Sequence, residues 1–240
     1  MSQHPPIRLS YFDARARAQF IRAFLAAREI PYEDERVPLD EGFASWMAIR
    51  PDRARSGPLQ RLPLLHYGDD LIPEGLVIAN FLHEVTGDAT ALGREADRRH
   101  AVLLSAGYTD LLMQIAMTIW ADLMYPGVDL AKAVASNFGR IQRTLGALDV
   151  ALADWGWVDA VGDRPVMLAD CLLWELLDQA QVLFGPALDL AATPTLERLY
   201  VRHPARQTFE SLLARKPAQI TGRPAEAAAI AEIRKALAAS

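Results

Sequence analysis

The first third of the chain alternates short strand-like and helix-like patterns of apolar residues. Residues 7–11, with the sequence Ile-Arg-Leu-Ser-Tyr, have a pattern typical of a strand, and residues 16–28 then carry apolar side chains at helical spacing. Residues 32–37 predict a second strand, whereas the polar stretch over residues 38–57 predicts a loop or an irregular helix. The chain therefore begins with a β-α-β unit.

A hairpin and a helix complete this first part of the chain. Two apolar runs, over residues 62–67 and 71–72, flank a turn-forming Gly-Asp-Asp at residues 68–70, which predicts antiparallel neighbouring strands. Residues 75–85 then place their apolar side chains on one helical stripe. These elements suffice for a short four-stranded sheet, in an α+β domain that ends near residue 86.

The rest of the chain has a helical pattern. Residues 87–93 are small and polar, as linkers are, and they separate a domain over residues 1–86 from an all-α domain over residues 94–240. Helices are predicted over residues 94–124, 130–153, 168–184, 195–202 and 204–215. The Ala-rich segment 224–240 predicts either a short docking helix or a frayed tail.

Composition and charge narrow the class of partner. The 240 residues are 51% hydrophobic and 23% charged, which is typical of a folded protein. The chain has 25 Lys and Arg residues and 30 Asp and Glu residues, so there is no basic excess to bind nucleic acid or an anionic membrane. The most apolar stretch, over residues 103–125, is interrupted by Asp110, Gln114 and Asp122, so we expect no membrane span.

The cysteine content and the first residues suggest a reducing compartment. A single cysteine, Cys171, excludes an intrachain disulfide and a zinc site of several thiolates. The first six residues lack the basic and apolar regions of a signal peptide, and we therefore expect a cytoplasmic protein. Cys171 lies in an apolar helical segment, where it is either a small buried side chain or a reactive nucleophile.

Several catalytic patterns are missing from the sequence. It has no Gly-rich phosphate loop, no Ser-centred nucleophile elbow, and no paired His or Cys at metal-ligand spacing. Its five histidines are scattered. We therefore expect no metal.

Two short features could bind an extended ligand. Pro63 opens an apolar strand, and since proline cannot donate to a β-ladder, Leu62-Pro63 belongs at a sheet edge or in a cis turn whose exposed backbone could bind a peptide. The alternative is an edge proline without function. Glu74-Gly75 stands at a helix N-terminus, which suits a ligand carboxylate, while Glu74 could accept from a ligand ammonium or merely cap its helix.

These features occur together with others in a recognisable order. They are Ser10-Tyr11-Phe12 with Arg15 and Arg17, then Trp46, Leu62-Pro63, Glu74-Gly75, Asp110, and Leu168-Ala169-Asp170. The set resembles the cytosolic glutathione S-transferases, in particular the tyrosine-type alpha, mu, pi and sigma classes, over essentially the whole chain. The resemblance implies a thioredoxin-like N-terminal domain, an all-helical C-terminal domain, a homodimer and a detoxification enzyme.

By this resemblance Tyr11 is the catalytic residue. Its hydroxyl would donate a hydrogen bond to the sulfur of glutathione and favour the thiolate, which then attacks an electrophilic carbon. Lowering a free thiol pKa of about 8.5 by about two units requires about 2.7 kcal/mol of differential stabilisation. A charge-assisted hydrogen bond contributes about 1.5–3 kcal/mol, which is the required size. Without the resemblance, Tyr11 would be taken for a core aromatic at a strand end.

The resemblance also assigns the binding residues for glutathione, which is a co-substrate here. The glycine carboxylate would meet Arg17, Trp46 and Arg50. The cysteinyl residue would pair with the backbone of Leu62, next to the cis proline Pro63. The γ-glutamyl end would meet Glu74 and Gly75, together with Asp110 of the neighbouring subunit.

The pocket for the second substrate is less well defined by the sequence. Asp110, Met113, Met117 and Trp120 recur at helical spacing and predict one helix face. With Phe12, the two methionines and Trp120 would form an adaptable apolar pocket for a small hydrophobic electrophile. The same spacing also fits residues that pack in a helix core.

The sequence departs from the family pattern at four positions. Gly75 stands where the family has a serine whose hydroxyl binds the γ-glutamyl carboxylate, so one hydrogen bond worth about 0.5–1.5 kcal/mol is missing. Ala16 replaces a glycine, Gln19 a glutamate, and Met167 a helix-capping serine or threonine.

The motifs taken together predict a glutathione transferase. The alternatives are a catalytically weak glutathione- or hydrophobe-binding protein, a glutathione-dependent isomerase, and an interaction module.

Overall fold

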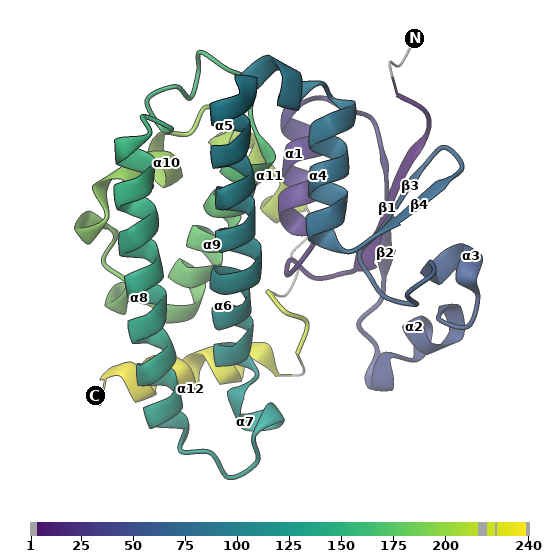
Figure 1. Ribbon diagram of the computed structural model, residues 1–240. Helices are drawn as coiled ribbons and strands as arrows, with labels where there is room; N and C mark the ends of the chain where they lie inside the picture. The colour runs from purple at the N-terminus through teal and green to yellow at the C-terminus, as the bar shows by residue number, and fades with distance from the viewer. Residues whose placement is uncertain (1–3, 216–219, 224, 239–240) are drawn as a thin grey trace.

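The computed structural model describes residues 4–215, 220–223 and 225–238. Its N-terminal part holds a four-stranded sheet with the strand order β2-β1-β3-β4 (Figure 1). The strands are β1 (Ile7–Phe12), β2 (Glu33–Val37), β3 (Leu64–Tyr67) and β4 (Asp70–Pro73). β1 pairs with β2 in parallel, whereas β1 with β3 and β3 with β4 pair antiparallel. The predicted β-α-β unit and hairpin are confirmed.

Two helices cover one face of this sheet. They are α1 (Gln19–Ala27) and α4 (Gly75–Val85), which lie side by side in Figure 1. Phe20, Ile21, Phe24 and Leu25 of α1 are completely buried, because their spacing puts them on the face toward the core. The stretch predicted as a loop or irregular helix contains η1 (Glu41–Phe43), α2 (Ala44–Ile49) and α3 (Arg53–Ser56).

The C-terminal part is entirely helical among the residues that are described. Its elements are α5 (Asp88–Ser105), the π-helical η2 (Ala106–Leu111), α6 (Leu112–Ile119), α7 (Ala121–Met124), α8 (Leu130–Asp154), α9 (Leu168–Phe184), η3 (Gly185–Ala187), η4 (Leu190–Ala192), α10 (Pro194–Arg202), α11 (Arg206–Arg215) and α12 (Glu226–Ala238). The predicted C-terminal helix corresponds to α12, and residues 224, 239 and 240 of that prediction lie outside the described residues.

The segment predicted as a linker is itself mostly helical. α5 already begins at Asp88, and its helical path is broken at Gly93. Gly87 and Gly93 both have positive φ, at 76° and 74°, a conformation that glycine adopts without steric cost. The connection between the two parts is therefore a short helical turn bounded by two glycines.

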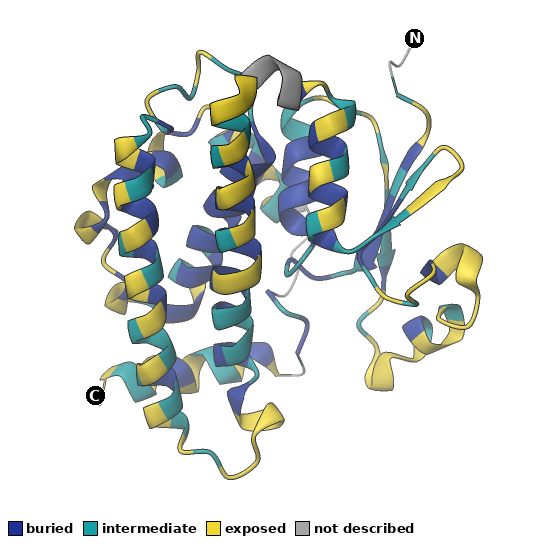
Figure 2. Cartoon of the chain, in the orientation of Figure 1, coloured by how far each residue is buried: buried dark blue, intermediate teal, exposed yellow. Residues whose placement is uncertain are grey.

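α9 forms the centre of the helical part. Nearly all its residues are buried, and it contacts α1, α5, α10 and α12, so that the sheet-covering helix α1 and the helical bundle share one core (Figure 2). The helical run Gly93–Ile119 is long and apolar enough to cross a membrane by length and composition alone. Half of its most apolar window is buried inside the molecule, against α8 and α9, as expected of a core helix in a bundle.

Candidate active site

Tyr11 lies near the end of β1, where the sheet meets the helical part. Its side chain is 6% exposed, and its hydroxyl accepts a hydrogen bond of 3.4 Å from the backbone N–H of Arg17. Burial raises the pKa of Tyr11, although the Arg17 N–H and the Arg17 and Arg22 charges oppose the shift. The hydroxyl is therefore protonated at neutral pH. Because the Arg17 amide supplies its own hydrogen, the phenol keeps its hydrogen for another acceptor.

A cavity of about 200 Å³ lies beside Tyr11, between the two parts of the chain. Its lining residues come from five segments: Tyr11, Ala16, Arg17, Leu112, Ala116, Trp120, Gln179 and Thr221. The walls are mixed: four lining residues are apolar, and the other four supply a phenol, a guanidinium, an amide and a hydroxyl. Such a cavity has room for the reacting end of a ligand next to the Tyr11 hydroxyl.

The turn that carries Arg17 is fixed by contacts with distant segments. Arg15 donates to Glu175 at 2.7 Å and to Asp178 at 2.6 Å, both on α9. The backbone N–H of Ala16 donates to the carbonyl of Ile220 at 2.6 Å. These contacts hold the Arg17 amide in position against the Tyr11 hydroxyl.

Glu74 and Pro63 bring the N-terminus of α4 to the start of β3. The Leu62–Pro63 peptide bond is cis, Pro63 is buried, and Leu62 is partly buried against the core. The N–H of Glu74 donates to the Pro63 carbonyl at 3.2 Å. Glu74 has φ 69° and ψ 125°, a conformation that costs a non-glycine residue about 1–3 kcal/mol and is typical of functional sites. Gly75 follows as the first, buried residue of α4.

Arg17 connects Tyr11 with this second group of residues. Its guanidinium lies 3.9 Å from a Glu74 carboxylate oxygen and 3.4 Å from the Met113 sulfur. It also lies over the ring of Tyr108, 5.9 Å from the centroid. The Arg17 side chain is 40% exposed. It is thus a partly free cation between the phenol and the N-terminus of α4.

Two predicted binding residues, Trp46 in α2 and Arg50 just after it, do not line the Tyr11 cavity. Trp46 is buried, and its ring packs edge-to-face on Phe12 with centroids 5.9 Å apart. Phe12 in turn packs on Tyr11 at 5.6 Å. Arg50 follows α2 and is exposed. The structure therefore brings Trp46 close to the Tyr11 strand and leaves Arg50 on the surface.

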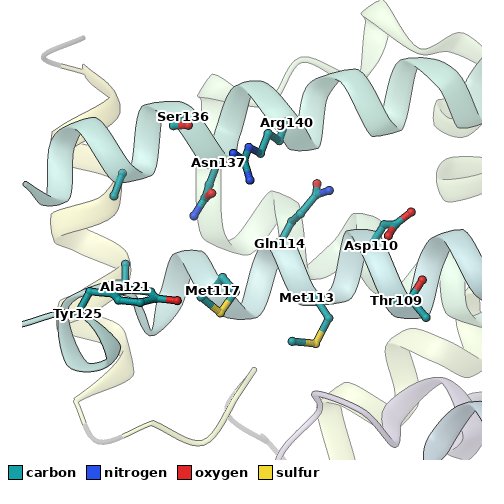
Figure 3. Close-up of a pocket in the computed structure, with 11 residues that line it drawn as sticks. Thr109, Asp110, Met113, Gln114, Met117, Ala121, Tyr125, Ser136, Asn137 and Arg140 are labelled. Atoms are coloured by element: carbon teal, nitrogen blue, oxygen red, sulfur yellow. The ribbon is translucent and has the colours of Figure 1, made fainter. Parts of the chain in front are cut away.

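The four residues predicted on one helix face are divided between two hollows. Asp110, Met113 and Met117 line a groove of about 470 Å³ with residues of α8 (Figure 3). Trp120 instead lines the Tyr11 cavity. Trp120 follows Leu112 and Ala116 at spacings of eight and four residues, and these two also line the Tyr11 cavity, so Trp120 belongs to the stripe next to that of Met113 and Met117. Met113 points away from α8 in Figure 3, toward its contact with Arg17.

Three polar residues near the site were not predicted. Gln179 and Thr221 line the Tyr11 cavity, and they come from helical and irregular segments whose pattern carries no polar motif. The third is Tyr108, whose ring packs on Phe20 with centroids 6.0 Å apart. Within the described parts of the chain, no three His, Cys, Asp or Glu side chains form a group that could hold a metal ion.

Curated relatives and solved structures identify the family to which this chain belongs. No family model matches the chain. It is 32% identical to mouse hematopoietic prostaglandin D synthase, over 89% of this chain and 98% of that protein. It is 36% identical to the class-mu 28 kDa glutathione S-transferase of Schistosoma mansoni, over 72% and 77%. The structure of rat prostaglandin D synthase complexed with a quinoline matches 90% of this chain and all of that one, with a TM-score of 0.65 and 25% identity. The chain belongs to the cytosolic glutathione S-transferase family of enzymes.

Proposed function

We propose that the protein binds glutathione and ionises its thiol for attack on a small hydrophobic electrophile. The observation that carries this proposal is the Tyr11 hydroxyl, which is protonated, accepts from the Arg17 N–H, and borders a cavity with its own hydrogen free. A thiolate beside this hydroxyl receives a charge-assisted hydrogen bond. The hydrogen bond stabilises the thiolate more than the thiol, and the thiol pKa falls.

The reaction is a nucleophilic substitution. The thiol loses its proton to solvent on binding, and the sulfur then forms a bond to the electrophilic carbon. The leaving group departs with the electron pair of the broken bond. Trp120 is the member of the predicted apolar set that lines the Tyr11 cavity, and we assign it to the electrophile. Phe12 packs on Tyr11 and Met113 contacts Arg17, so both lie next to residues of this cavity.

The rest of glutathione would extend from Tyr11 across the N-terminal part. The cysteinyl backbone would lie at Leu62-Pro63, and the γ-glutamyl end at Glu74-Gly75. Glu74 offers a carboxylate to the ligand ammonium, and the first N–H groups of α4 lack helical partners and face its carboxylate. The glycyl end would lie toward Trp46 and Arg50.

Titration calorimetry with glutathione tests the proposal. We expect saturable binding and turnover of an aromatic halide, with glutathione consumed. Binding without turnover would support the weak-binder alternative. The absence of binding to the folded protein would overturn the proposal.

The resemblance to prostaglandin D synthase favours a second candidate function. It spans 98% of the mouse relative, so an isomerase that adds and then releases the same thiolate fits this chain as well. The two functions differ in stoichiometry, since a transferase consumes one glutathione for each product and an isomerase consumes none. Measuring free thiol during turnover of a candidate substrate distinguishes them.

We also propose that the protein is a homodimer in the cytoplasm. Asp110 is exposed and lines the groove between α6 and α8 with Arg140, which places a carboxylate where a second subunit could meet it (Figure 3). Light scattering is expected to give twice the chain mass of 26.5 kDa. Asp110→Asn is expected to weaken glutathione binding roughly three- to tenfold at unchanged mass, because it removes a charge from the neighbouring site. A monomer, or unchanged affinity, would contradict this role.

A further inference from the structure

The space above Gly75 is filled by a side chain from another helix. A Cβ placed on Gly75 would collide with the hydroxyl of Tyr108 and would lie 2.8 Å from two of its ring carbons. The Tyr108 hydroxyl thus stands where the side chain of residue 75 would otherwise be. The serine of the family pattern, which brings its own hydroxyl to this place, does not fit here.

The Tyr108 hydroxyl has no partner of its own. Tyr108 is 7% exposed, and its oxygen is buried without a hydrogen bond to any described residue. Leaving a buried hydroxyl unpaired is costly, and native structures contain few such groups. Burial raises the pKa of Tyr108 to about 12, against the opposing charge and hydrogen-bonding approach of the Arg17 side chain. Because a guanidinium only donates, the Tyr108 hydroxyl keeps its own hydrogen as a donor at neutral pH. An unpaired buried donor next to a helix N-terminus suits an anionic ligand.

The backbone around Tyr108 explains its direction. Tyr108 lies in the π-helical segment η2, and such segments are common at functional sites because the added residue redirects the side chains around it. Its neighbour Gly107 packs directly on α9, where a Cβ would lie 2.8 Å from Leu172. This close packing holds η2 against α9.

We propose that the Tyr108 hydroxyl donates a hydrogen bond to the α-carboxylate of the γ-glutamyl end of glutathione, in the role of the serine that this chain lacks at Gly75. The inference rests on the proposed function. The carboxylate is bound jointly by this hydroxyl and by the first N–H groups of α4, a helix of 11 residues. The Arg17 guanidinium beside the ring lies 3.9 Å from Glu74 and 3.4 Å from the Met113 sulfur, and its positive charge would attract the arriving carboxylate.

The conservative variant Tyr108→Phe tests this role by calorimetry. It keeps the ring packing and removes the donor, and we expect glutathione to bind roughly tenfold more weakly. The matched ligand is 4-aminobutyryl-cysteinyl-glycine, which keeps the amine of glutathione and lacks the γ-glutamyl carboxylate. Wild type and Tyr108→Phe are expected to bind this analogue equally. Tyr32→Phe, beside the far end of β1, serves as the control and is expected to leave the affinity unchanged.

A second set of variants moves the hydroxyl back to residue 75. Gly75→Ser alone is expected to weaken glutathione binding, because its Cβ meets the Tyr108 ring. Tyr108→Leu alone is also expected to bind glutathione weakly, because it lacks the hydroxyl that donates to the carboxylate. The combination of Gly75→Ser with Tyr108→Leu provides both a hydroxyl and the space for it, and we expect it to bind more tightly than either single variant.

Each outcome bears on one of the two proposals. If wild type binds glutathione and Tyr108→Phe binds it equally well, or if the analogue shows the same loss, the role of Tyr108 is wrong and the proposed function stands. Tighter binding by Tyr108→Leu would show that Tyr108 closes the site, which also overturns the role. If wild type does not bind glutathione, both proposals fail.

Discussion

Tyr11→Phe is expected to lower the rate of glutathione conjugation to an aromatic halide by roughly 10- to 100-fold at neutral pH. The variant keeps the ring, its packing on Phe12 and the cation of Arg22 at 5.8 Å, and it loses only the hydroxyl. That hydroxyl contributes one charge-assisted hydrogen bond, worth about 1.5–3 kcal/mol, to the thiolate but little to the thiol. Without this hydrogen bond a smaller fraction of bound glutathione is ionised, and kcat/KM falls for that reason.

The pH dependence separates this role from a structural one. In the wild type the thiol pKa is lowered, so the rate should level off near neutral pH. In Tyr11→Phe the thiol pKa returns toward its free value of about 8.5, and the rate should continue to rise with pH up to that value. The thiolate can be followed directly by its ultraviolet absorbance in the binary complex.

The control for this experiment is a partly buried tyrosine. Tyr32 lies just before β2, beside the end of β1 opposite Tyr11, and burial raises its pKa to about 12. Tyr32→Phe is expected to leave the rate and its pH profile unchanged. An active Tyr11→Phe enzyme with the rate and pH profile of the wild type would disprove the catalytic assignment.

The sequence predicts the local elements well because each has its own signal. Residues 75–85 and 168–184 are helices with the predicted bounds, since apolar spacing marks their faces and a glycine starts one and ends the other. The helix predicted over residues 94–124 is interrupted by η2 and is divided again at Trp120, between α6 and α7. A pattern of period 3.6 does not reveal an inserted π-turn, because packing of Gly107 on α9 is a tertiary contact.

The candidate site is predictable where its residues form local motifs. Tyr11 and Arg17 are close in sequence, and the structure joins them through a hydrogen bond. Glu74 is joined to Pro63 in the same way. Tyr108 is different, because the only trace of it in the sequence is the glycine at position 75 that makes room for its hydroxyl. That relation becomes visible only when two helices are placed side by side.

Asp170 of the Leu168-Ala169-Asp170 motif is expected to contribute at least as much free energy to folding as the Tyr11 hydroxyl contributes to catalysis. Asp170 is completely buried at the start of α9. Its carboxylate accepts from Trp157 at 2.8 Å, from Arg164 at 2.7 and 2.9 Å, and from the backbone N–H of Met167 at 2.9 Å. The last of these bonds shows that the carboxylate half of the helix cap persists, although Met167 replaces the usual serine or threonine.

Asp170→Asn is expected to lower the free energy of unfolding by about 3–5 kcal/mol, measured by chemical denaturation. An asparagine has one acceptor oxygen, and its NH₂ group would face donors that have lost their acceptor. The Arg164 side chain, 12% exposed, would keep its charge without a partner. The control is Asp159→Asn, whose 2.9 Å pair with Arg198 is solvated at both ends and contributes at most about 1 kcal/mol.

The pH dependence of this difference has a definite sign. Burial alone would raise the pKa of Asp170, but the hydrogen bonds and charge of Arg164, together with His203 at 4.0 Å, outweigh it and hold the pKa well below its usual range. A carboxyl group with a lowered folded-state pKa stabilises the fold above its unfolded pKa of about 3.9, and the contribution is lost as pH falls through the folded value. The stability gap between wild type and Asp170→Asn should therefore stay constant from neutral pH to about 5 and narrow below about 4. A gap that widens on acidification, or one no larger than that of Asp159→Asn, would mean that Asp170 does not anchor α9, the helix that holds Arg15 and, through it, the turn beneath Tyr11.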